Sequence, residues 1–170
     1  MVPNPRPPVP TEDWPPPDEM LIEIGRLSML WVTLENFLNI CIGKLAGFDP
    51  VKSPIAHVFT LHSTFPQRLD IFSSLCDHLS PAHPHLSTYK EVISDIKEAQ
   101  SLRNKFIHNP MGYNKEIGRY ELGQASARGK FKSSVDMVTI EQVKQTSHKI
   151  FYAARKLYEL VLKNGLPPAT

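Results

Sequence analysis

The chain has 170 residues, of which 41% are hydrophobic and 21% are charged, a balance typical of one folded domain with a buried core. A formal net charge of +2 is too small to indicate a nucleic-acid partner for the chain as a whole, so any basic surface must be local. The most apolar stretch, residues 20–48, is interrupted by Glu23, Arg26, Glu35 and Lys44, which argues against a membrane span. With no secretory signal pattern at the start of the sequence, we expect a cytoplasmic location.

The first 17 residues hold half of the 16 prolines in the chain. Proline cannot propagate a helix or a central strand, so residues 1–17 are predicted to form an extended arm with Trp14 as a docking point. A passive arm is favoured over recognition by a proline-binding partner. Residues 18–165 are predicted to form one helical domain, and residues 166–170 a short tail.

Two helical regions open the predicted domain. Apolar residues alternate in steps of four and three from residue 18 to about residue 46, which predicts a long amphipathic helix. The same rhythm covers residues 55–79 but meets Pro66, where Thr64 and Gln67 form a T-x-x-Q capping box. We therefore expect a break at this proline and a second helical segment that ends near residue 79.

The two cysteines, Cys41 and Cys76, lie on the apolar stripes of these helical regions. A cysteine on such a stripe is most often a small hydrophobic residue of the core. Both are therefore predicted to be reduced, buried thiols rather than partners in a disulfide.

A third helix is predicted from Thr88, with a capping box to Glu91, as far as Ile107. Residues 113–138 then alternate loosely around Gly129 and predict a β-hairpin. The last helix starts at a third capping box, residues 139–142, and extends toward residue 165. The predicted fold class is all-α, an antiparallel bundle of four to five helices joined by short links, with a β-hairpin insertion before the last helix.

The stretch "SLRNKFIHNP", residues 101–110, breaks the pattern of the third helix. Arg103 falls where the stripe requires an apolar residue, and His108 follows five positions later. Five residues turn an ideal helix by about 140°, so the two side chains do not share one face. Either the helix ends near Ile107 and His108 turns back, or two copies of the chain pool these residues across a two-fold axis.

These residue types suit RNA cleavage. A histidine titrates near neutrality and can accept the proton of a ribose 2′-hydroxyl. The planar fork of an arginine matches a phosphate that gains charge during attack. A neighbouring asparagine can orient either group through hydrogen bonds.

The segment "RNKFIH" resembles the Arg-polar-x3-His motif of the HEPN superfamily, the higher eukaryotes and prokaryotes nucleotide-binding domains. The order of predicted elements over residues 18–165 is also similar. The resemblance implies a metal-independent endoribonuclease without a cofactor, with Arg103 binding phosphate, Asn104 as its polar partner and His108 as the catalytic histidine. It further implies a homodimer with RNA as substrate, in the role of a toxin or defence effector that meets an antitoxin or another protein partner. The alternative is a catalytically inactive helical module that binds a nucleotide or a protein.

Further candidate residues surround the motif. Five basic residues of the predicted hairpin could bind the substrate backbone, although an ordinary solvated hairpin explains them equally well: Lys115, Arg119, Arg128, Lys130 and Lys132. Glu35 and Arg68 are candidate supporting residues. For Glu35, an ion pair with Arg103 or Arg68 is favoured over a catalytic role.

A metal site is not expected. The cysteine and histidines nearest to one another in the sequence, Cys76, His78, His83 and His85, straddle a proline loop and do not match a closed zinc pattern.

Overall fold

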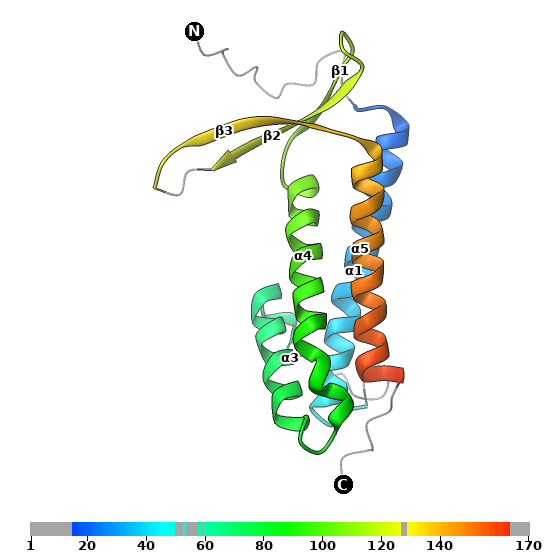
Figure 1. Cartoon of the computed structure of the whole chain (residues 1–170), viewed down its shortest axis with the longest axis vertical. Helices are drawn as coiled ribbons and strands as arrows, with labels where there is room; N and C mark the ends of the chain where they lie inside the picture. The colour runs from blue at the N-terminus through cyan, green and yellow to red at the C-terminus, as the bar shows by residue number, and fades with distance from the viewer. Residues whose placement is uncertain (1–14, 50–52, 54–57, 59, 127–128, 164–170) are drawn as a thin grey trace.

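The computed structural model describes residues 15–49, 53, 58, 60–126 and 129–163. Within them the chain is mostly helical, and a three-stranded antiparallel sheet lies across one end of the helices (Figure 1). The elements are α1 (Asp18–Leu45), α3 (Phe65–Leu79), a short 3-10 helix η1 (Pro84–Thr88), α4 (Tyr89–Ile107), β1 (Met111–Asn114), β2 (Arg119–Ser126), β3 (Lys132–Val138), α5 (Ile140–Tyr158) and a π-helical turn η2 (Glu159–Lys163).

The first predicted helix is confirmed as α1. Its first turn holds two acidic residues, Asp18 and Glu19. Their negative charges stabilise the helix because they lie at the positive end of its dipole. Its end is a Schellman motif: the N–H of Phe48 donates to the carbonyl of Gly43, and the N–H of Gly47 donates to that of Lys44. Gly47 has a φ of 85°, which a side chain would strain, so this glycine ends the helix.

The predicted start of α3 is also confirmed. Thr64 precedes the helix, and its N–H donates to Oε1 of Gln67 over 2.8 Å. Residues 58, 60 and 61 are helical and residues 62–64 are not, so the predicted break before α3 is confirmed. Residues 54–57 and 59 lie outside the described residues, as do most of the proline-rich arm, including Trp14, and the tail.

The box predicted at Thr88 is wrong. Thr88 is the last residue of η1, with φ −86° and ψ 7°, and its side chain caps nothing. The 3-10 turn leads directly into α4, so Thr88 does not have the extended backbone that a capping box requires. The last box is confirmed: Thr139 Oγ1 accepts from the N–H of Gln142 over 3.2 Å at the start of α5.

The helices do not form the predicted antiparallel arrangement throughout. Contacts between α1 and α5 advance in the same direction along both helices, from Glu23 beside Ser147 to Phe37 beside Tyr158. Among the helices of the described residues, only α4 runs against its neighbours, as the ion pairs Asp95–Lys156 and Glu98–Lys149 show.

The direction of α3 follows from the connection that precedes it. Trp31 of α1 contacts Phe65 at the start of α3, and Glu35 contacts Arg68 one turn later, so α3 runs parallel to α1. The connection from α1 to α3, residues 46–64, is long enough to return the chain to the level of Trp31 before α3 begins. A short link would have produced an antiparallel pair.

The insertion before α5 is a three-stranded sheet in the order β1-β2-β3, and not the predicted hairpin. Strands β2 and β3 are that hairpin, with Tyr120 paired to Val138. Strand β1 was not predicted, and it pairs Met111 with Leu122. Its turn is formed by Asn114, whose Oδ1 accepts from two backbone N–H groups, and by Gly118 at a φ of 64°.

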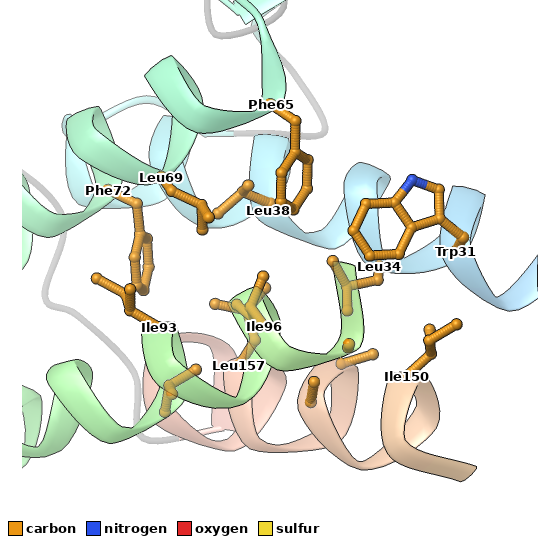
Figure 2. Close-up of a cluster of buried hydrophobic side chains, with 14 of the residues drawn as sticks. Trp31, Leu34, Leu38, Phe65, Leu69, Phe72, Ile93, Ile96, Ile150 and Leu157 are labelled. Atoms are coloured by element: carbon orange, nitrogen blue, oxygen red, sulfur yellow. The ribbon is translucent and has the colours of Figure 1, made fainter. Parts of the chain in front are cut away.

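The core lies between the helices and takes side chains from all four of them. Figure 2 shows Leu34 and Leu38 of α1, Phe72 of α3, Ile96 of α4 and Leu157 of α5 facing one another. All of these side chains are fully buried. No helix among the described residues is long and apolar enough to cross a membrane.

Both cysteines are buried, free thiols, as predicted. Burial raises the pKa of Cys76 to about 12 and raises the pKa of Cys41 further. Because an ordinary thiol has a pKa of about 8.5, the folded protein retains protons that the unfolded chain loses. The free energy of unfolding should therefore fall as the pH rises above that ordinary value toward 12.

We expect both thiols to resist alkylation in the native protein. At pH 8 a thiol with a pKa of about 12 is ionised about a thousandfold less than a free one. Mass spectrometry after brief iodoacetamide treatment should find neither cysteine modified in buffer and both modified in guanidinium chloride. Rapid modification of Cys76 in buffer would contradict this burial.

Candidate active site

The end of α4 brings the two motif residues together within one chain. The helix ends at Ile107, and His108 follows it with φ −101° and ψ 0°, so its ring turns back along the last helical turn. Arg103 Nη1 lies 2.7 Å from His108 Nε2 and donates to Asn104 Oδ1 over 3.1 Å. The first of the two arrangements considered from the sequence is therefore the one observed, and the convergence needs no second copy of the chain.

The 2.7 Å contact indicates the protonation state of the histidine in this arrangement. An arginine nitrogen only donates hydrogen bonds, so Nε2 of His108 must be the acceptor. The imidazole is then neutral, with its proton assigned to Nδ1. A neutral Nε2 can accept a proton from a substrate once Arg103 no longer donates to it.

The guanidinium of Arg103 has an unusual environment. Its Cζ lies 5.5 Å from the centre of the Trp31 ring, and Trp31 is only 4% exposed. Its Nε is buried and has no hydrogen-bond partner. Among the described residues no carboxylate lies within ion-pairing distance of Arg103. The positive charge is therefore held against an aromatic face without a neutralising acid, which leaves it available to an anion.

A second arginine flanks the same aromatic pair. Trp31 and Phe65 have ring centres 4.8 Å apart, and the guanidinium of Arg68 lies 5.6 Å from the Phe65 ring. Unlike Arg103, Arg68 is tied down: it donates to Asn39 over 3.1 Å and lies 3.4 Å from a carboxylate oxygen of Glu35. The two candidate supporting residues thus pair with each other, and Glu35 is an ion-pair partner of Arg68 rather than of Arg103.

The fold leaves this site uncovered by α3. The contact between Trp31 and Phe65 marks the start of α3, and Arg103 stacks on Trp31 just beyond it. Figure 1 shows α3 beside the half of α4 that is distant from the sheet. His108 is exposed and Arg103 and Asn104 are partly exposed, so an extended ligand could reach all three side chains.

The sheet supports the end of α4 through its own polar contacts. Lys105 Nζ lies 2.8 Å from Asp136 Oδ2 of β3, and Gln124 Nε2 of β2 donates to the same oxygen over 2.6 Å. Asn109 donates to the carbonyl of Lys105 over 2.8 Å. These contacts hold the chain on either side of His108, and no signal in the sequence alone had indicated Asp136.

The basic residues of the insertion do not gather at the site. Lys115 and Arg119 lie at the turn between β1 and β2, whereas Lys130 and Lys132 lie at the other end of β2. Eight residues of strand separate the two ends by about 25 Å. Arg128 lies outside the described residues. Phe131, which is 71% exposed, lies between Lys130 and Lys132 and is not near Lys115 and Arg119.

No group of three or more histidine, cysteine, aspartate or glutamate side chains could hold a metal ion in the part of the chain that the structure describes. Cys76 is buried in the core. His83 and His85 contact each other with ring centres 6.0 Å apart.

Two important residues of the site, Trp31 and Phe65, were predicted only as members of apolar stripes. Their sequence positions carry no signal for this cluster, because Arg103 of α4 contacts Trp31 of α1, and Trp31 in turn contacts Phe65 of α3. Comparisons with protein-family models, with curated proteins and with solved structures find no match for this chain.

Proposed function

We propose that the chain is a HEPN-like, metal-independent endoribonuclease in which Arg103, Asn104 and His108 form the active site. The observation that carries the proposal is the 2.7 Å approach of Arg103 Nη1 to the neutral Nε2 of His108, with no acid paired to the arginine among the described residues. An arginine that has no acid as its partner, next to a neutral histidine, provides an anion-binding group and a base at one point.

In the proposed reaction, a phosphodiester of RNA binds to the guanidinium of Arg103 and replaces His108 as its partner. Nε2 of His108, released from the arginine, accepts the proton of the 2′-hydroxyl. The 2′-oxygen attacks the adjacent phosphorus, and the bond to the 5′-oxygen of the next nucleotide breaks, with a proton from water completing that hydroxyl. Arg103 stabilises the charge that grows on the phosphate oxygens, and Asn104 orients its fork through the 3.1 Å hydrogen bond.

The products distinguish this chemistry from other nucleases. We expect the protein to cleave an RNA oligonucleotide in the presence of EDTA and to leave a 2′,3′-cyclic phosphate, because the attacking oxygen is the 2′-hydroxyl. The all-deoxy oligonucleotide of the same sequence should remain intact, because it lacks that hydroxyl. Mass spectrometry of the cut ends measures the outcome. Cleavage of the DNA, or a requirement for magnesium, would exclude the mechanism.

A homodimer and a role as a toxin or defence effector belong to the same proposal. They are supported by the resemblance of residues 103–108 to the HEPN motif and by the position of that motif on a helix that precedes an insertion and a last helix. Sedimentation at micromolar concentration would test the dimer.

One observation favours the alternative of an inactive binding module. In this structure the Nε2 lone pair of His108 is engaged by Arg103, so the base becomes free only when an anion displaces it. If the hydrogen bond persists with RNA bound, the motif binds without cleaving. A filter-binding experiment that finds RNA affinity without cleavage would support this alternative.

A further inference from the structure

A second polar cluster lies between α1 and α5. Glu23 is the one charged residue among the buried residues that the structure describes, at 5% exposed. It lines a cavity of about 280 Å³ together with Arg26, Ser147, His148 and Phe151. The sequence pattern had shown Glu23 only as an interruption of an apolar stretch and Ser147 only as a member of an apolar stripe.

The base of this cavity has unused hydrogen-bonding capacity. Ser147 is 2% exposed, and its hydroxyl has no hydrogen-bond partner, although the hydroxyl of the adjacent Thr146 donates to the carbonyl of Gln142. Glu23 accepts from a single nitrogen, Nη1 of Arg26, which lies 2.6 and 2.7 Å from its two oxygens. A buried hydroxyl without a partner is costly, and its presence beside a buried carboxylate indicates a ligand that supplies donors.

The side chains at the rim and along the wall of the cavity limit which ligands it can bind. Arg26 is more than half exposed, and Lys144 and His148 line the same opening from α5. These groups favour an anionic substituent and disfavour a basic side chain from a partner protein. Phe151, 50% exposed, and Leu30 form an apolar wall on which a planar ring can stack.

We propose that this cavity binds the guanine base of a nucleotide. The adjacent N–H groups at the edge of guanine are donors that a carboxylate accepts, while the phosphate reaches the cationic rim. Adenine presents an acceptor nitrogen beside its amino group, which a carboxylate would repel. Free nucleotide and RNA share this chemistry. The inference does not rest on the proposed ribonuclease activity, because none of the residues that line the cavity belongs to the proposed active site.

Titration calorimetry with GMP and AMP tests the proposal. The wild-type protein should bind GMP at least tenfold more tightly than AMP, and Glu23→Gln should remove that preference. Ser147→Ala should weaken GMP binding severalfold, whereas His78→Ala, in the last turn of α3, should leave it unchanged. A pentanucleotide with one guanosine that binds more tightly than GMP would identify RNA as the source, and tighter binding of GMP would identify the free nucleotide.

Amide chemical shifts of the wild-type protein provide a readout that does not depend on whether a variant folds. GMP should shift the signals of residues 23 and 147 and leave that of residue 78, at the end of α3, in place. Equal affinity for GMP and AMP would overturn the proposal, as would GMP shifts confined to residues 103–108. Either result would leave the RNA-cleavage proposal to its own tests.

Discussion

Replacing His108 with alanine is expected to lower the single-turnover rate of RNA cleavage by a factor of about 10² to 10⁴, the usual loss when a general base is removed. The exposed His108 contributes little to the core, so the melting temperature should change by no more than an ordinary surface substitution changes it. Rates on a labelled RNA, measured beside thermal melts of both proteins, separate the two effects.

A matched histidine provides the control for this substitution. His78 is exposed in the last turn of α3, at the end of that helix away from Trp31, so His78→Ala should retain the wild-type rate. If His78→Ala and His108→Ala lowered the cleavage rate equally, the measured rate would not depend specifically on the proposed site. Full activity in His108→Ala would show that His108 is not the base.

Replacing Arg103 with lysine is expected to lower the same rate by a factor of about 10² to 10³, comparable to the loss of one preorganised donor. Lysine preserves the charge but loses the planar fork that can contact a phosphate and Asn104 together. It also loses most of the stacking on Trp31, which should cost about 0.5–2 kcal/mol of stability. The expected variant is folded, slightly less stable and nearly inactive.

Arg119 provides the comparison for Arg103. It is exposed at the start of β2, and Arg119→Lys should leave both the rate and the melting temperature unchanged. If Arg103→Lys retained the wild-type rate, a point charge would be sufficient and the fork would have no part in the mechanism. If Arg103→Lys unfolded the protein, the main role of the contact between Arg103 and Trp31 would be to stabilise the fold.

Much of the helical structure could be predicted because its signals are local. The start of α5 follows from Thr139 and Gln142, three residues apart, and the end of α1 from a glycine that adopts a positive φ. The convergence of Arg103 and His108 was also within reach of the sequence, since Pro110 ends the helix close enough for His108 to turn back.

The remaining features depend on contacts between distant residues. The direction of α3 follows from where the long connection returns the chain, and helical periodicity does not report that. Strand β1 is four residues long, too short for alternation to stand out, and it is stabilised by pairing with β2. The stacking of Arg103 on Trp31 joins residues 72 positions apart, so no spacing rule could indicate it.

The most direct test of the proposed site compares the wild-type protein with an Arg103→Ala/His108→Ala double variant, both purified in parallel. Each is incubated with the same total RNA in EDTA, and new 2′,3′-cyclic phosphate ends are mapped by sequencing. The account predicts discrete cuts with the wild-type protein and none with the double variant, although both melt as folded proteins. Identical cut patterns from the two proteins, or no cuts from the wild type, would contradict it.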